Sequence, residues 1–162
     1  MHNIVVVTLL MFSIFSDVQP QKYSYSEPVG SGGGDTFSIT GEGRITAVRV
    51  WEQYNNLITG LQLRYGHIWS PAVGSRVGAL KDFELYDGEA IVQISGKFTS
   101  SVQSVVFVTN LGRFLQAGQP RGNSFNMYPT SKEAELRIIS GQVRNGFTSF
   151  GAHWAAVQEL HF

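Results

Sequence analysis

The sequence contains no cysteine among its 162 residues, and charged residues make up only 15% of it. Without cysteine the chain has no disulfide and no thiol nucleophile, so its hydrophobic core must hold the fold together unaided. Its 12 lysine and arginine residues balance 12 aspartate and glutamate residues, which leaves no net charge. Because nucleic-acid binding depends on an excess of basic residues, the composition argues against nucleic acid as a partner.

Sequence motifs of common enzymes are also missing. G-x-S-x-G, H-E-x-x-H and G-x-x-x-x-G-K-[ST] do not occur, and His67, His153 and His161 lack the spacing of metal ligands on one element. The acidic residues between positions 82 and 89 fit a solvated strand and turn better than a catalytic carboxylate pair. We therefore expect no enzyme activity, no cofactor and no metal site.

Near the N-terminus a mostly apolar stretch extends from Ile4 to Leu10, interrupted by Thr8, and polar residues follow from Asp17 onward. Such a run is too short to span a bilayer and is typical of a signal peptide, which we place over residues 1–18. A buried N-terminal strand is the alternative. The signal peptide predicts a secreted protein, located outside the cell, in a secretory granule or in mucus.

The rest of the chain favours β-structure, because 18 glycines separate short runs in which apolar and polar residues alternate. Asp87-Gly88 and Asn145-Gly146 are favoured hairpin turns between such runs. No long apolar repeat of helical period occurs, so we predict an all-β fold in one domain over residues 22–158, with a tail over 159–162. Periodicity leaves a sandwich, a barrel and a prism open.

Two glycine-bearing clusters are candidates for a binding site. The first, Gly30 to Asp35, is either a flexible linker or a loop whose bare backbone lets a ligand approach closely. The second, Gly151 to Ala155, contains a histidine and a tryptophan side by side. By composition alone, this second cluster fits the packing of a buried strand end at least as well as the rim of a site.

Several stretches follow one another along the chain in an order that resembles the jacalin-related lectins. They are YSYSEPVGSGGGDTFS, ITAVRVW, GLQLRYGHIWS, FELYDGEAIVQISGKF, SVVFVTNLGRFLQAG, GNSFN, LRIISGQ and FGAHW. The resemblance covers nearly the whole predicted domain. It implies a β-prism I fold, with three antiparallel Greek-key sheets related by pseudo-threefold symmetry, and one carbohydrate-binding site at the apex of the prism.

The resemblance also implies that three loops form this site. The first is the glycine-rich loop Gly30, Ser31, Gly32, Gly33 and Gly34, and the second, which tunes glycan preference, is Lys97, Phe98, Thr99 and Ser100. The third is expected to carry a Gly-x-x-x-Asp pattern, and we place it on Gly151, Ala152, His153, Trp154 and Ala155. In this chain the pattern would end in Ala155.

Loss of the carboxylate matters because an ionised aspartate accepts hydrogen bonds from sugar hydroxyls, whereas alanine accepts none. Asp35, directly after the glycine-rich loop, is the best candidate for a compensating acid, although it also fits a solvated turn, and Glu159 is the second candidate. We expect a lectin for glycans or glycoproteins, mannose-type or related, with weakened binding. The alternative is a prism that does not bind sugar and has a protein partner, which it would contact through exposed aromatic residues, or a polyanion partner. The sequence leaves polyanion binding and the oligomeric state open.

Overall fold

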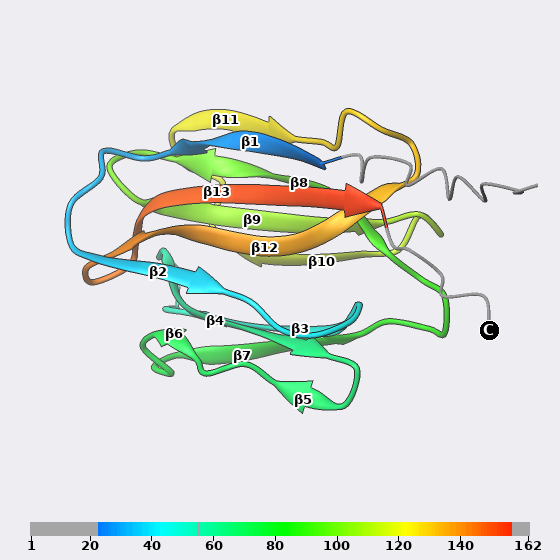
Figure 1. Ribbon diagram of the computed structural model, residues 1–162. Helices are drawn as coiled ribbons and strands as arrows, with labels where there is room; N and C mark the ends of the chain where they lie inside the picture. Colours follow the sequence, from blue (N-terminus) through cyan, green and yellow to red (C-terminus); the bar gives the residue numbers. More distant parts are fainter. Residues whose placement is uncertain (1–22, 55, 157–162) are drawn as a thin grey trace, which may run out of the picture.

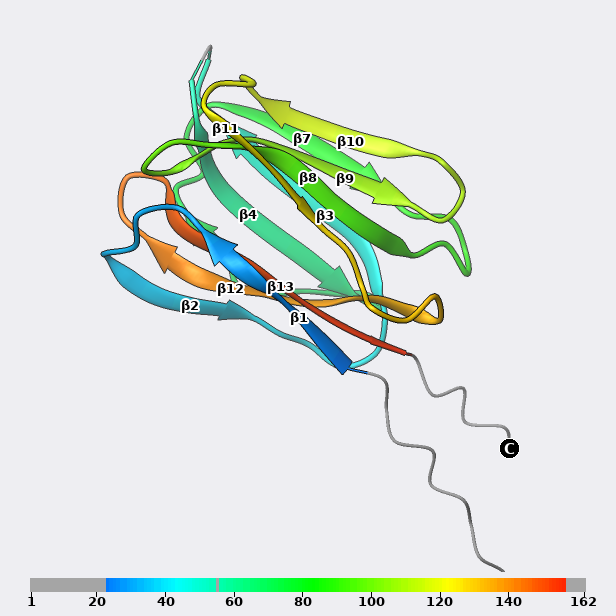
Figure 2. The ribbon, with the colours of Figure 1, turned by 90° about the horizontal axis from the view of Figure 1, so that it is seen from above.

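The computed structural model describes residues 23–54 and 56–156, and all regular structure in these two segments is β-strand. Their strands form three antiparallel sheets around a common interior, which we call sheets A, B and C (Figures 1 and 2). The predicted signal peptide over 1–18, the tail over 159–162 and the domain limits at 22 and 158 lie outside the described residues. Those boundaries therefore stay predictions.

Sheet A joins the first and last strands of the described chain. A hairpin of β12 (Ala134–Val143) and β13 (Phe147–Ala156) lies at its centre, with β1 (Tyr23–Val29) beside β13 and β2 (Asp35–Ile39) beside β12. The hairpin turns at Asn145-Gly146, as predicted, where the Arg144 N–H donates to the Gly146 carbonyl at 2.9 Å. Asn145 has a positive φ of 50°, which asparagine tolerates well.

Sheets B and C repeat the plan of a central hairpin with strands on both sides. Sheet B contains β3 (Ile45–Glu52) and β4 (Ile58–Tyr65), flanked by β7 (Ala79–Glu84) beside β3 and by β5 (Ile68–Trp69) and β6 (Val73–Gly74) beside β4. Sheet C contains β8 (Ile91–Phe98) and β9 (Val102–Thr109), flanked by β10 (Phe114–Gly118) and β11 (Asn123–Met127). In sheet C the fourth strand returns beside the first, which is a Greek key. The predicted prism of three antiparallel sheets is confirmed.

The turn at Asp87-Gly88 is not a hairpin. The Glu89 N–H donates to the Tyr86 carbonyl at 3.0 Å, so the chain does turn there. However, the strand before it, β7, belongs to sheet B, and the strand after it, β8, belongs to sheet C. The predicted hairpin is therefore wrong, because the two strands form their hydrogen bonds with different partners.

The core fills the space between the inner faces of the three sheets. Its fully buried members come from every sheet and include Val48, Val50, Leu61, Leu63, Ile94, Phe107, Leu136, Ile139, Phe147 and Trp154. Burial of these side chains away from water is the main stabilising term in a chain without disulfides. The Trp154 indole N–H is also satisfied, since it donates to the Ser26 hydroxyl at 2.9 Å.

A buried tyrosine joins sheet B to sheet A. The Tyr65 hydroxyl on β4 lies 2.9 Å from the Ile39 carbonyl on β2 and 2.7 Å from the Arg137 carbonyl on β12. Burial raises the pKa of Tyr65 well above its usual value, so the hydroxyl keeps its proton and can donate it. These hydrogen bonds link sheet B to sheet A through a buried polar group.

A buried carboxylate joins the turn before β8 to the end of β9. Glu89 is 3% exposed and accepts hydrogen bonds from the Tyr86 N–H at 2.7 Å, the Thr109 hydroxyl at 2.6 Å and the Arg113 guanidinium at 2.5 Å. Burial disfavours its ionised form, but these donors outweigh that effect and hold the pKa of Glu89 below its usual value. The group is therefore an ionised carboxylate that links these two parts of the chain.

Candidate functional site

The glycine-rich loop connects β1 to β2 at the left end of the prism in Figure 1. Gly30, Gly32, Gly33 and Gly34 all have positive φ angles, between 76° and 118°, which residues with a side chain rarely adopt. A Cβ atom on Gly30 would lie 2.2 Å from the Thr148 carbonyl oxygen, whereas a Cβ on Gly33 would meet nothing within 4 Å. The loop therefore packs tightly on one side and exposes bare backbone on the other.

Two other segments hold this loop in place. From the β8–β9 loop, the Ser100 carbonyl accepts hydrogen bonds from the Ser31 N–H and the Ser31 hydroxyl, both at 3.0 Å. From sheet A, the Thr148 carbonyl accepts the Gly32 N–H at 2.7 Å, and the Thr148 hydroxyl donates to the Gly33 carbonyl at 2.5 Å. The glycine-rich loop, the β8–β9 loop and the β12–β13 hairpin thus meet at one end of the prism.

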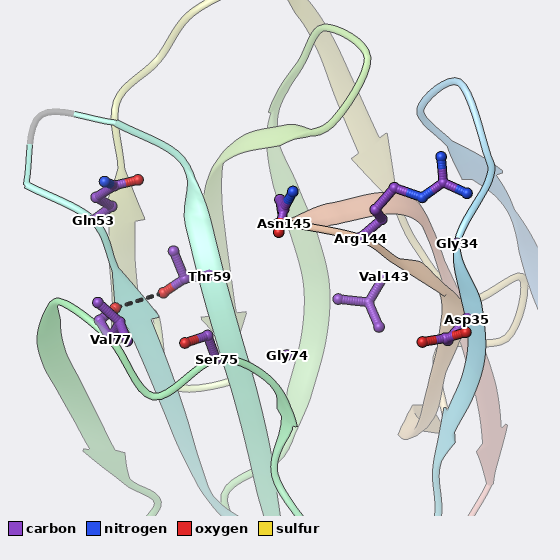
Figure 3. Close-up of a pocket in the computed structure, with 11 residues that line it drawn as sticks. Gly34, Asp35, Gln53, Thr59, Gly74, Ser75, Val77, Val143, Arg144 and Asn145 are labelled. Atoms are coloured by element: carbon purple, nitrogen blue, oxygen red, sulfur yellow. Dashed lines mark hydrogen bonds between the residues drawn. The ribbon is translucent and has the colours of Figure 1, made fainter.

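A cleft opens beside this junction, between the β12–β13 turn of sheet A and the turns of sheet B (Figure 3). Its volume is about 840 Å³. It is lined by Gly34, Asp35, Gln53, Thr59, Gly74, Ser75, Val77, Val143, Arg144, Asn145 and Gly146. Because Gly34 belongs both to the glycine-rich loop and to the cleft wall, the two surfaces are continuous.

The structure brings only part of the predicted second loop to this junction. Thr99 and Ser100 are exposed in the β8–β9 loop, and Ser100 contacts Ser31 as described above. Lys97 instead lies on β8 with its ammonium 3.5 Å from the Gly122 carbonyl, and Phe98 packs against the core. The physical reason is strand alternation, which sends the side chains of successive β8 residues to opposite faces of sheet C.

The prediction that Gly151 to Ala155 forms the third loop is wrong. These residues lie inside β13, where Ala155 pairs with Tyr23, and His153 pairs with Tyr25. Ala152 and Trp154 point into the core, and Ala155 is 5% exposed on the outer face of sheet A. A strand paired on both sides has no free backbone to offer a ligand, so this cluster is the buried strand end that composition alone had allowed.

His153 lies on the outer face of sheet A. Its Nδ1 hydrogen-bonds to the Tyr23 hydroxyl and its Nε2 to the Ser140 hydroxyl at 2.7 Å, so both ring nitrogens have partners. The Tyr25 ring stacks against it, with centroids 4.5 Å apart. Burial lowers the pKa of His153, which keeps the ring neutral at pH 7.

The segment that does lie against the glycine-rich loop is the β12–β13 turn, residues 143–148. Sequence reasoning missed it as a site, although its Asn145-Gly146 signal marked the turn itself. None of its residues is acidic. The nearest described carboxylate lining the cleft is that of Asp35, which is exposed at the start of β2 directly opposite Val143.

Within residues 23–54 and 56–156, no group of three histidine, cysteine, aspartate or glutamate side chains gathers to hold a metal ion. No helix that could cross a membrane occurs in the same segments. The groups at the junction that a ligand could contact are backbone, hydroxyl, amide, carboxylate and guanidinium groups.

Comparison with known proteins agrees with this architecture. The jacalin-like lectin domain matches residues 26–153. Zymogen granule membrane protein 16 of Homo sapiens is 40% identical over 158 residues, which cover 95% of this chain and 94% of that protein. The chain therefore belongs to the family of jacalin-like lectin domains.

Solved structures show the same fold. A prostate-specific WGA16 glycoprotein lectin is 30% identical, with a TM-score of 0.74 over 83% of this chain and all of that one. Calsepa lectin, solved in complex with a biantennary N-glycan, is 19% identical, with a TM-score of 0.72 over 83% of this chain and 97% of its own. At that identity the second similarity concerns the fold alone.

Proposed function

We propose that the protein is a carbohydrate-binding lectin whose sugar site lies at the junction of the glycine-rich loop, the β8–β9 loop and the β12–β13 turn. The observation that carries this proposal is the exposed backbone at Gly33, where a Cβ atom would have no neighbour within 4 Å. The Gly33 N–H donates to the Gln142 side-chain oxygen at 2.8 Å, and the Gly33 carbonyl accepts from the Thr148 hydroxyl. A pyranose ring can approach this backbone closely, where its hydroxyls can donate to the second lone pair of the carbonyl or replace Gln142 as the partner of the N–H. The family membership of the chain supports the same conclusion.

We propose that the ligands are mannose-type or related glycans and that this site binds them weakly. The β12–β13 turn lacks the carboxylate that a Gly-x-x-x-Asp pattern would supply there, and a hydrogen bond to a charged group contributes about 1.5–3 kcal/mol. Asp35 lines the adjacent cleft and is the acid we propose as a partial replacement. A single sugar residue bound with about 4 kcal/mol corresponds to a millimolar dissociation constant, so the loss of one such bond brings binding to the limit of detection.

The relatives named zymogen granule membrane protein 16 support a place in the secretory route. We therefore propose that the protein is secreted or stored in secretory granules and meets glycans or glycoproteins there. Isolation of the native protein from a cell that expresses it, followed by N-terminal sequencing, tests this. A start near residue 19 is expected, and an intact Met1 would contradict it.

Titration of the folded protein with methyl α-mannoside and a mannose-rich oligosaccharide, followed by NMR, tests the sugar site. We expect saturable shifts of backbone amide signals in Gly30 to Gly34 and in residues 144–148. Signals of Gly151 to Ala155 should not move, because those residues lie inside β13. If no glycan in a broad array binds to the folded protein, the proposed function is wrong.

Two matched glycine variants separate a loss of binding from a loss of folding. Gly33 and Gly43 have φ angles of 91° and 83°, and neither has an atom within 4 Å of an added Cβ. The alanine substitution therefore strains the backbone comparably at both positions. Gly33→Ala should weaken glycan binding by at least about tenfold, or 1.4 kcal/mol, whereas Gly43→Ala, in the turn between β2 and β3 at the opposite end of the prism, should leave it unchanged.

A further inference from the structure

The outer face of sheet B carries its charges in two separate columns. Sheet B is the lowest layer in Figure 1, and its outer face points away from sheets A and C. Side chains alternate along β3, so Val48 is fully buried in the core while Arg49 lies on the outer face. Arg49 on β3 and Arg64 on β4 form a basic column. Asp82 and Glu84, on the neighbouring edge strand β7, form an acidic column.

These charges pair within the face but keep hydrogen-bonding groups for a partner. Arg49 Nε donates to Asp82 at 3.2 Å, and a terminal nitrogen of Arg64 donates to Glu84 at 2.7 Å. In the described part of the chain, the terminal nitrogens of Arg49 donate no hydrogen bond, and one carboxylate oxygen of Asp82 and one of Glu84 accept none. The Asp82 and Glu84 side chains are 48% and 73% exposed, so groups of opposite charge can reach them from outside.

The face is also flat, and its charged groups are held in place. The Arg49 guanidinium lies 3.9 Å from the centre of the Trp69 ring, a stacking contact that fixes this arginine across the face. The ring of Trp51 lies flat against Gly60, where an added Cβ would be 3.2 Å from it. Leu80, opposite Trp51 on β7, leaves apolar surface exposed. Because few side chains need to be ordered on binding, association at this face has a low entropy cost.

A two-fold axis that lies in the plane of such a face exchanges its basic and acidic sides. If the axis runs parallel to β3, between β3 and β7, the basic column of each copy faces the acidic column of the other, with Arg49 opposite Asp82 of the second copy. A partner of uniform charge would instead be attracted by one column and repelled by the other. We propose that two copies of this chain associate through the outer faces of their B sheets.

The size of the face predicts a weak, reversible dimer. β3 has 8 residues, which span about 26 Å, and the four strand positions across the sheet span about 19 Å, so each copy buries about 500 Å². This area is below the roughly 800 Å² per partner of a standard interface and is typical of transient ones. We expect a dissociation constant of about 0.1–1 mM.

The axis also sets the direction of the two sugar sites. Because it runs parallel to the strands, both glycine-rich loops lie at the same end of the dimer, the left end in Figure 1. Two weak sites that face one glycan-bearing surface bind it more tightly than either site alone, through their effective concentration. This consequence rests on the proposed function, whereas the interface itself does not.

Sedimentation equilibrium of the folded protein at concentrations up to about 1 mM tests the interface. We expect a monomer–dimer equilibrium. Raising the salt from about 0.1 M to about 1 M shortens the Debye length from about 10 to 3 Å and should weaken association at least about threefold. In NMR spectra, the indole signal of Trp69 should shift with protein concentration.

Charge reversal separates the interface from the effect of net charge. The Asp82→Arg and Glu84→Arg double variant makes both columns basic and should associate at least about tenfold more weakly than the wild type. The matched control is the Glu27→Arg and Glu42→Arg double variant, which changes the net charge equally at exposed acids outside this face, on β1 and in the β2–β3 turn. The control should dimerise as the wild type does.

A second variant tests the complementarity directly. The Arg49→Glu and Arg64→Glu double variant makes both columns acidic and should be monomeric, whereas an equimolar mixture of the acidic and basic variants should form a heterodimer. Circular dichroism confirms that each variant is folded. If the acidic variant does not fold, the basic variant and the Trp69 signal still decide the question.

A wild-type protein that stays monomeric at low salt and about 1 mM would overturn the interface, as would a dimer that persists unchanged in the basic variant. These results are independent of sugar binding. A monomer that binds glycans refutes the interface and leaves the proposed function standing, whereas a dimer that binds no glycan supports the interface and refutes the proposed function.

Discussion

The substitution Ala155→Asp distinguishes between two possible locations of the sugar site, one at the end of the prism and one on β13. If Gly151 to Ala155 formed a binding loop, Ala155→Asp would restore a missing carboxylate and strengthen sugar binding. In the structure Ala155 is 5% exposed and lies between Tyr23 of β1 and Glu135 of β12. Glu135 is itself 5% exposed and pairs with Arg44, at 2.7 Å. The introduced carboxylate would therefore be buried beside an existing one.

The expected destabilisation follows from this geometry. Directly opposed residues of antiparallel strands have Cβ atoms about 5 Å apart, and two like charges at about that distance repel by about 3 kcal/mol at an effective dielectric constant of about 20. Arg44 can offset part of this repulsion, while burial of the new charge adds to the cost. We expect a loss of about 2–3 kcal/mol in unfolding free energy. In a domain of this size that corresponds to a fall of about 4–12 °C in Tm.

Urea unfolding and thermal melting, followed by tryptophan fluorescence, measure this loss. Ala155→Asn is the matched control, because it has nearly the same shape and no charge, and it should cost clearly less than Ala155→Asp. Neither variant should bind methyl α-mannoside more tightly than the wild-type protein. An Ala155→Asp protein that is as stable as the wild type and gains sugar affinity would refute the placement of these residues inside a buried strand.

Two further predictions concern the polar groups that link the sheets. Because the pKa of Glu89 is held below its usual value, its ionised form stabilises the fold above about pH 4.3, and this contribution is lost as the pH falls further. Glu89→Gln should therefore lower the unfolding free energy by about 2 kcal/mol at pH 7, because it weakens the hydrogen bond to Arg113. If the difference in unfolding free energy between the variant and the wild type stays constant down to pH 3 in urea titrations, this reasoning is wrong. Tyr65→Phe removes the hydroxyl that donates to the Ile39 and Arg137 carbonyls and should lower the unfolding free energy by about 1–2 kcal/mol at pH 7. An unchanged urea midpoint would show that this hydroxyl does not contribute to stability.

The all-β class was accessible from local sequence signals, whereas the choice of a prism came from the resemblance to jacalin-related lectins. Alternation of apolar and polar residues indicates a strand with one buried face. The Asn145-Gly146 pair indicates a chain reversal, which the structure contains. Asp87-Gly88 has the same signal and also turns, but the strands on either side join different sheets. Turn residues set the local backbone angles, whereas the choice of hydrogen-bonding partners depends on contacts distant in sequence. Local chemistry alone could not distinguish these two turns.

The candidate site was only partly accessible for a related reason. The glycine-rich loop could be identified because its conformation depends on glycine itself, at positions such as Gly30 where a side chain would clash. The β8–β9 loop could be placed only to within a few residues. A shift of one residue along β8 moves a side chain from the core to the opposite face, which is the difference between Phe98 and Lys97.

The third segment was missed because a sequence motif consists of side chains, whereas the structure uses backbone at this place. The resemblance placed a Gly-x-x-x-Asp pattern on Gly151 to Ala155, although the acid is missing there, and the structure shows that Gly151 faces the ring of Tyr25 inside a paired strand. The turn at residues 143–148 has no acid to mark it. Its contribution is the Thr148 carbonyl and hydroxyl, which hold the glycine-rich loop in position. Since any residue supplies a backbone carbonyl and serine or threonine supplies the hydroxyl, the glycine-rich loop can keep its conformation in a chain whose turn lacks the acid.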